Sequence, residues 1–162
     1  MKHLLDLDTY PLDRPESPEY VALVASCRAR LAADGMFDLP GFVRSDVTKE
    51  AADAVKPAMA TEAFRHARKH NIYFRDTVEG LTEGHPALTK VETVNHTLCA
   101  DQLGGNPVID IYEWPPFAEF LAAAMGKPAL YRMDDPMARV NVQASRAGEA
   151  LNWHFDRSEF TT

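Results

Sequence analysis

At 162 residues, the chain is long enough for one domain with a buried core. Its 46% hydrophobic and 25% charged content is ordinary for a soluble globular protein, and a net charge of −7 argues against a nucleic-acid-binding surface. No apolar run approaches the roughly 18 residues of a membrane span, and the acidic N-terminus does not resemble a signal peptide, so we expect a cytoplasmic protein without membrane contact. Cys27 and Cys99 are expected to be buried free thiols.

The first third of the chain is predicted to be mainly helical after an irregular arm. Residues 1–16 combine prolines with acids and are expected to lie on the surface. Ser17, followed by Pro and Glu, predicts a helix start, and apolar residues recur at helical spacing up to Gly35. A second helix is predicted to begin at Ser45 or Thr48.

Two histidines fall in the next predicted helix. Pro57 is expected to end or kink the second helix, and residues 58–69 to continue as a third helical piece. His66 and His70 would then lie one turn apart, a spacing that could bind a metal. No acidic partner or third ligand accompanies them, so a basic, solvated face is the favoured interpretation.

The middle of the chain is less regular. Residues 71–74 are predicted to form a strand, and residues 76–89 a loop that could border an active site. Residues 89–103 suit either a helix or a strand. Asn95 and His96 lie there in a polar patch, where a local hydrogen-bonding role is favoured over a substrate contact.

Towards the C-terminus, strands are predicted to follow a helix. An apolar stripe from Phe117 to Met125 indicates a core helix, which Gly126 ends. Residues 129–133 are predicted to form a strand, and Asp134–Pro136 a turn.

The last two predicted strands carry the most informative pattern. Residues 139–144 alternate between polar and apolar side chains, and Gly148 supplies a turn. Residues 151–156 alternate again, with Trp153 expected in the core. The polar face of the second strand is made of Asn152, His154 and Asp156.

His154 and Asp156 have the spacing of two ligands to one metal ion. Residues two apart on a strand point to the same face, with Cα atoms roughly 7 Å apart. Two histidines and one carboxylate on one face are the ligand set of non-haem Fe(II) oxygenases. The motif by itself is only a hypothesis, and the strand, turn and strand around it strengthen the hypothesis.

The order of strand, Gly turn, strand and His-x-Asp resembles the start of the double-stranded β-helix of Fe(II)/2-oxoglutarate-dependent oxygenases. Residues 127–133 (KPALYRM) and 152–160 (NWHFDRSEF) are similar to a bacterial branch of small-molecule and amino-acid hydroxylases and their halogenase relatives. The similarity extends back through residues 90–98 (KVETVNHTL).

The resemblance implies that His154 and Asp156 bind Fe(II), with 2-oxoglutarate as co-substrate. The halogenases replace the carboxylate with Gly or Ala, so Asp156 implies hydroxylation. Complete members carry a second His and a 2-oxoglutarate-binding Arg on later strands, whereas this chain ends six residues after Asp156. The remaining histidines all precede the motif: His3, His66, His70, His85 and His96. We therefore expect the N-terminal part of an oxygenase, with two of three ligands and inactive by itself.

Further residues are weaker candidates for binding small molecules. Arg139, Asn141 and Gln143 on the polar strand face are candidates for holding co-substrate or substrate. Arg157 and Asn95 are candidates for substrate contacts, although strand alternation points Arg157 away from the His154 face.

The expected fold is a single α+β domain over residues 1–162. Helices dominate residues 1–126 and pack on the first strands of a jelly-roll-like β-helix in residues 127–162. The expected partners are a small-molecule substrate, possibly a free amino acid, and O2. One alternative is a non-catalytic module that forms a homodimer along the strand edge at residues 158–162. A zinc hydrolase is a further alternative, but the motif lacks the partner spacing of zinc sites.

Overall fold

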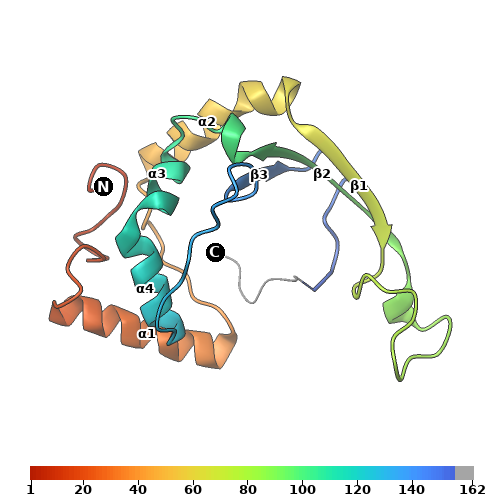
Figure 1. Ribbon diagram of the computed structural model, residues 1–162, viewed down its shortest axis with the longest axis horizontal. Coiled ribbons are helices and arrows are strands. Elements are labelled where there is room, and N and C mark those ends of the chain that lie inside the picture. Colours follow the sequence, from red (N-terminus) through yellow and green to blue (C-terminus); the bar gives the residue numbers. More distant parts are fainter. Residues whose placement is uncertain (156–162) are drawn as a thin grey trace. The chain divides into compact units, whose positions relative to one another are not determined.

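The computed structural model describes residues 1–155, which form an α+β arrangement of four α-helices and an open three-stranded antiparallel sheet (Figure 1). The predicted α+β class is confirmed. The described chain divides into a helical unit, residues 1–57 with 99–141, and a sheet unit, residues 58–98 with 142–155. In chain order the elements are α1 Pro18–Asp34, α2 Ser45–Thr61, β1 Phe64–His70, β2 Val91–Cys99, α3 Pro107–Glu113, α4 Pro115–Met125 and β3 Asn141–Ala144, with short 3₁₀ turns at Pro86–Leu88 and Ala100–Gln102.

The helices of the helical unit begin and end where their capping residues predict. Ser17 caps α1 by accepting a hydrogen bond from the backbone N–H of Tyr20 at 3.1 Å, and Gly35 ends α1 in the left-handed conformation. Asn106 caps α3 in the same way, and Gly126 ends α4 with φ of 66°. The predictions of α1 and of the helix at 117–125 are confirmed.

The core of the helical unit includes the N-terminal arm. Phe120 of α4 is fully buried and meets Tyr20 of α1 edge-on, with ring centroids 6.2 Å apart. The arm donates and accepts backbone hydrogen bonds with residues 42–44, and its leucines are buried in the same cluster. The prediction of a surface arm over residues 1–16 is therefore wrong, because Leu4, Leu5, Leu7 and Leu12 are buried. Removing these four apolar side chains from water stabilises the packed arm.

One expected helix is absent, and the second helix does not end at Pro57. Of the two expectations for Pro57, an end or a kink, the end is excluded because Pro57 lies inside α2, which continues to Thr61. The predicted third helix is instead strand β1, so His66 and His70 are not one helical turn apart but four residues apart on a strand. Pairing with β2 overrides the local helical preference of the Arg- and Lys-rich segment.

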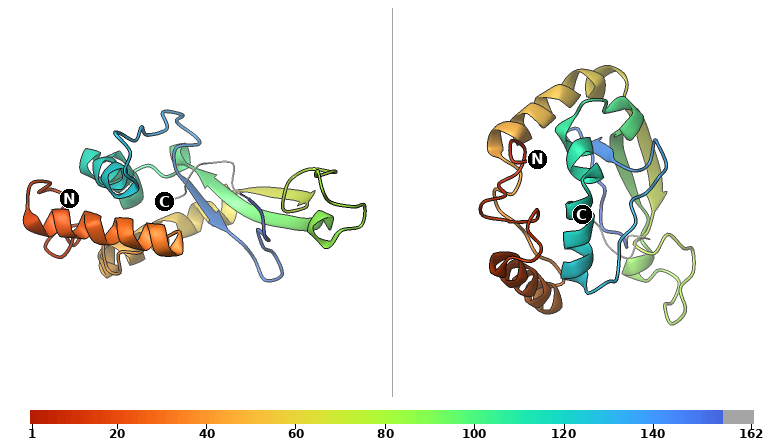
Figure 2. Two further views of the ribbon diagram at one scale, coloured as in Figure 1. Left: turned by 90° about the horizontal axis from the view of Figure 1, so that it is seen from below. Right: turned by 60° about the vertical axis from the view of Figure 1, so that its left-hand side comes forward.

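The sheet has the order β1-β2-β3, and the β1–β2 pair forms its longest ribbon (Figure 2). In the antiparallel register His66 faces Asn95 and Arg68 faces Thr93. The ambiguous segment 89–103 is thus resolved as strand β2 followed by a 3₁₀ turn.

Several predicted strands are absent or shortened. Residues 71–74 form a turn, and no strand covers residues 129–133 or 151–155. In the last of these segments, Asn152 takes a φ of 55°, and this left-handed residue interrupts the extended backbone that alternation requires. The turn at Gly148, with φ of 84°, and β3 before it are confirmed.

Candidate functional site

His154 lies in the segment that follows the Gly148 turn. This segment is fixed to β2, because Val94 donates its N–H to the carbonyl of Ala150 at 3.0 Å and the Asn152 side chain donates to the carbonyl of Glu92 at 2.6 Å. The backbone N–H of Phe155 donates to Ile72 O at 3.2 Å. The segment is therefore held on both sides of His154 without being a regular strand.

The imidazole of His154 has a defined orientation. Its Nδ1 lies 2.8 Å from the carbonyl oxygen of Asn152, which can only accept a hydrogen bond, so Nδ1 carries a proton and the neutral ring is the Nδ1–H tautomer. Metal-binding histidines commonly donate one ring N–H to a backbone carbonyl and bind metal with the other nitrogen. The half-buried His154 has the tautomer that an Nε2 ligand requires.

The rings of His70 and Phe74 pack beside the ring of His154, and together they are called the aromatic wall below. His70 and Phe74 both meet the His154 ring edge-on, with centroids 6.3 and 6.0 Å away. Phe74 also stacks on His70 at 4.1 Å, and the guanidinium of Arg68 lies 5.3 Å from the Phe74 centroid. These contacts restrict the rotation of the His154 ring about its side-chain bonds.

The wall is built by a turn that Asn71 organises. The buried Oδ1 of Asn71 accepts hydrogen bonds from the N–H groups of Tyr73 and Arg75, at 3.1 and 3.2 Å, and its Nδ2 donates to Arg75 O. This turn puts Phe74 in the left-handed region with φ of 56°, which is strained for an aromatic residue. The strain is offset by the contacts of the Phe74 ring with its neighbours.

A buried polar relay joins His70 to the His154 segment. The Nδ1 of His70 lies 2.9 Å from Asn71 O, and its Nε2 lies 2.8 Å from the hydroxyl of Thr93. The same hydroxyl donates to the carbonyl of Leu151 at 2.8 Å. Thr93 thus links the aromatic wall to the backbone three residues before His154.

A charged cluster occupies the opposite face of the sheet. Glu149 lies 3.1 Å from Nε2 of the buried His96 and 3.8 Å from Nε of Arg65. The backbone N–H of Arg146, and then the side chain of His96, hold the pKa of Glu149 below its usual range. This cluster fixes the Gly148 turn, and through it the start of the His154 segment.

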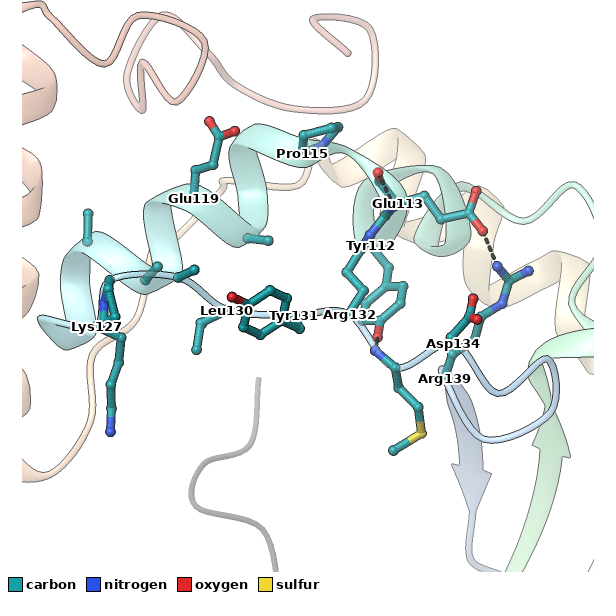
Figure 3. Close-up of a pocket in the computed structure, with 16 residues that line it drawn as sticks. Tyr112, Glu113, Pro115, Glu119, Lys127, Leu130, Tyr131, Arg132, Asp134 and Arg139 are labelled. Carbon is teal, nitrogen blue, oxygen red and sulfur yellow. Dashed lines mark hydrogen bonds and ion pairs between the residues drawn. The ribbon is translucent and has the colours of Figure 1, made fainter.

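The helical unit contains a separate open pocket of about 850 Å³ between α4 and the chain that follows it (Figure 3). Arg132 and Arg139 both bond to Glu113, Arg132 to its carbonyl and Arg139 to its carboxylate. The hydroxyl of Tyr112 accepts a hydrogen bond from Met133 N at 2.8 Å. The pocket therefore has a polar end, where the Glu113 carboxylate pairs with Arg139 and Arg132 bonds to a backbone carbonyl.

The other predicted site residues do not all lie on the strand face where they were expected. Arg139 is not on β3 and points to Glu113 in the pocket of the helical unit, so its predicted place on the polar strand face is wrong. Asn141 donates to the carbonyl of Ala138 at 3.1 Å, and Gln143 is exposed on β3. Asp156 and Arg157 lie outside the described residues.

Three further expectations can be compared with burial. Trp153 is 86% exposed, so its predicted core position is wrong, because the alternation on which that prediction depended is absent. Asn95 is 5% exposed, and its Oδ1 is buried without a hydrogen-bond partner, so the favoured local hydrogen-bonding role is not observed for this atom, whereas the neighbouring His96 does contact Glu149. Cys27 and Cys99 are free thiols, as predicted, although Cys99 is only half-buried.

The residues that shape the wall were not identified from the sequence. Asn71 carries a usable signal, because Asn favours turns through side-chain hydrogen bonds to its own backbone. Phe74 and Thr93 carry none, because their roles depend on β1–β2 pairing and on a segment far along the chain.

Within residues 1–155, no group of three or more His, Cys, Asp or Glu side chains is arranged to hold a metal ion. No helix in that range is long and apolar enough to cross a bilayer. Comparison with protein-family models, with curated proteins and with solved structures found no match.

Proposed function

We propose that the chain is part of an Fe(II)- and 2-oxoglutarate-dependent dioxygenase that hydroxylates a small molecule. In this proposal His154 and Asp156 are two of the three protein ligands of iron. The observation that supports it is the 2.8 Å contact from Nδ1 of His154 to Asn152 O, the backbone-carbonyl contact that metal-binding histidines commonly make through the ring nitrogen that does not bind the metal.

The fold proposed for the complete site is a double-stranded β-helix. The antiparallel sheet β1-β2-β3 would provide its first strands, with the His154 segment held near the N-terminal end of β2. The second histidine and the arginine for 2-oxoglutarate would come from strands that follow the motif, as the family pattern requires.

Each described residue has a definite task in this proposal. Iron with 2-oxoglutarate would supply the capacity to oxidise a C–H bond with O2, and 2-oxoglutarate would be converted to succinate and CO2. His154 holds the metal through Nε2, and the carboxylate of Asp156 contributes one negative charge. Asn152 fixes the tautomer of His154, while His70 and Phe74 fix the direction of its ring.

Turnover tests the proposal directly. A polypeptide that joins residues 1–162 to the sequence encoded after Thr162 should show a weak visible charge-transfer band with Fe(II) and 2-oxoglutarate under argon. It should release succinate on addition of O2 and substrate. His154→Ala and Asp156→Ala should abolish both signals, while His85→Ala, at a histidine whose Nδ1 caps a 3₁₀ turn, should leave them unchanged. Full signals in both ligand variants would overturn the proposal.

A second candidate is an interaction module without catalysis. Trp153 and Phe155 are exposed large apolar side chains in the segment beside β2, as a surface for a partner protein or a second copy would require. This candidate predicts association that depends on concentration and is lost in Trp153→Ser, with no response to Fe(II).

A further inference from the structure

We infer that the open pocket of the helical unit, between α4 and residues 127–134, binds a small organic acid with an apolar body. Arg132 and Tyr112 hold the carboxylate of this acid, and the apolar body lies against the short side chains of α4. The site lies within the helical unit, and the inference does not rest on the proposed iron centre.

The pocket exists because one face of α4 carries only short side chains. Pro115, Ala118 and Ala122 are three and four residues apart, so they share one face of the helix, and all three line the pocket. An alanine side chain ends at Cβ, so this face leaves space between the helix and the chain that passes over it.

The passing chain is held only at the two ends of this face. Lys127 donates its backbone N–H to Ala122 O at 2.9 Å, and Met133 donates its own to the Tyr112 hydroxyl at 2.8 Å. Residues 128–132 make no backbone–backbone hydrogen bond within the described chain. The segment therefore spans the face without filling it, and about 850 Å³ remains, within the roughly 300–1,000 Å³ of small-molecule sites.

The polar end of the pocket has hydrogen-bond donors that a ligand can reach. Arg132 is exposed, and within residues 1–155 only its Nη1 has a hydrogen-bond partner, the carbonyl of Glu113. The half-buried Tyr112 accepts from Met133, so its hydroxyl proton remains available. Figure 3 shows both side chains at the same end of the pocket.

A carboxylate matches this set of donors. A guanidinium has five N–H groups in a planar fork, which fits the two oxygens of one carboxylate. Hydrogen bonds to a charged acceptor are about twice as strong as those to a neutral carbonyl. The Tyr112 hydroxyl then donates a further hydrogen bond to the same group.

The acidic residues of the lining leave this position to a ligand. Glu113 already pairs with Arg139, and Figure 3 shows Glu119 pointing away from residues 130–132. Asp134 is exposed, so solvent and salt screen its charge. No carboxylate of residues 1–155 pairs with Arg132, which is therefore the cation that an incoming acid meets.

The apolar lining distinguishes this acid from 2-oxoglutarate. The lining beyond the polar end includes Pro115, Ala118, Ala122 and Leu130. The second carboxylate of 2-oxoglutarate would lie against these side chains without a hydrogen-bond partner, which is unfavourable. An aromatic or short aliphatic monocarboxylate instead buries its body there and gains from leaving water.

NMR titration of the 162-residue chain without metal tests the site. The probes are 4-fluorobenzoate, the uncharged 4-fluorobenzamide, the cationic 4-fluorobenzylamine and 2-oxoglutarate. The readouts are the backbone amide signals of residues 118–133 and the Ala118 methyl signal. We expect 4-fluorobenzoate to shift these signals and to bind about tenfold more tightly than each other probe, as one lost charge-assisted hydrogen bond predicts.

Matched variants test the two parts of the site separately. Arg132→Gln should weaken 4-fluorobenzoate binding about tenfold. Arg14→Gln, at an arginine that also donates to a backbone carbonyl, that of Leu7, should change binding less than about twofold. Ala118→Leu fills the space above α4 and should abolish binding, whereas Ala33→Leu on the exposed side of α1 should not.

Three results would overturn the inference. The first is binding of the amide, the amine or 2-oxoglutarate as tight as that of 4-fluorobenzoate. The second is unchanged binding in Arg132→Gln or in a folded Ala118→Leu. The third is a set of signal shifts in the unaltered chain that lies outside residues 112–139, which decides the location even if Ala118→Leu does not fold. Binding should persist in His154→Ala, so the site and the proposed iron centre fail independently.

Discussion

The helical unit and the sheet unit bury different kinds of side chain. In the helical unit the buried cluster is almost entirely apolar, with Phe120 at its centre. In the sheet unit the buried residues of β2 are largely polar, and they include Thr93, Asn95, His96 and Thr97. Burial of apolar side chains stabilises the helical unit without requiring a particular orientation of the groups in contact. Each buried polar group in the sheet unit, by contrast, requires a hydrogen-bond partner. Within the described residues of β2, the Oδ1 atom of Asn95 is shielded from solvent and has no hydrogen-bond partner, so this unit carries a cost that the apolar core of the helical unit avoids.

The largest effect should follow from removing the centre of the apolar cluster. Phe120→Ala should lower the free energy of unfolding by about 3–5 kcal/mol, because a fully buried ring leaves a cavity. Chemical denaturation followed by tryptophan fluorescence measures this loss. Phe64→Ala, at a β1 residue that is 51% exposed, is the matched control and should cost less than about 1 kcal/mol. Equal losses in the two variants would remove the contrast between the units.

A smaller effect is expected at the turn that shapes the aromatic wall. Asn71→Ala should cost about 1–3 kcal/mol, because two backbone N–H groups and one carbonyl lose their side-chain partner. Hydrogen exchange should locate the loss at residues 71–75. Asn141→Ala removes a single exposed bond to Ala138 O and should change exchange little. Unchanged protection at Tyr73 and Arg75 in Asn71→Ala would contradict the assigned role.

The relay through Thr93 should contribute less than the turn. Thr93→Val keeps the shape of the side chain and removes the hydroxyl between His70 and Leu151, at a cost of about 1 kcal/mol. Thr97→Val on the same strand removes a hydroxyl that makes no hydrogen bond within residues 1–155 and should be nearly neutral. Denaturation of both variants in parallel provides the comparison, and a more costly Thr97→Val would refute the relay.

The smallest predicted effect depends on pH. The pKa of Glu149 is lower in the folded chain than in the unfolded one, so its stabilising contribution is present above the unfolded pKa of about 4.3. That contribution is lost as the pH falls towards the folded pKa. The protection factor of the Arg146 amide, which is the intrinsic exchange rate divided by the observed rate, should therefore fall on acidification below about pH 4.3 in the unaltered chain. The same pH change should have no comparable effect on this protection factor in Glu149→Gln, and a parallel loss of protection in the two proteins would contradict the assignment.

The sequence predicts elements that depend on neighbouring residues and fails where distant pairing decides. Ser17 and Gly35 bound α1 because caps act within one turn. β1 was predicted as a helix because its strand conformation depends on pairing with β2, which comes later in the chain. The buried arm could have been predicted, since four of its first twelve residues are leucines.

The candidate site shows the same division. The residue types of the motif and the Gly148 turn were readable from the sequence, and the turn is confirmed. The backbone around His154 was not readable, because the left-handed Asn152 and the Phe74 wall depend on contacts with β2 and with the 71–75 turn. Arg139 was misplaced for a similar reason, since an ion pair with Glu113 of α3 holds it in the helical unit.

The most direct test of the central claim is NMR of the histidine rings during addition of Mn(II). The ¹⁵N shifts of His154 should first show the proton on Nδ1. Substoichiometric Mn(II) should then broaden the ring protons of His154 before those of His66 and His85, and Asp156→Ala should remove this order. Simultaneous broadening of all three histidines, or a His154 ring with its proton on Nε2, would contradict the claim that His154 is a metal ligand.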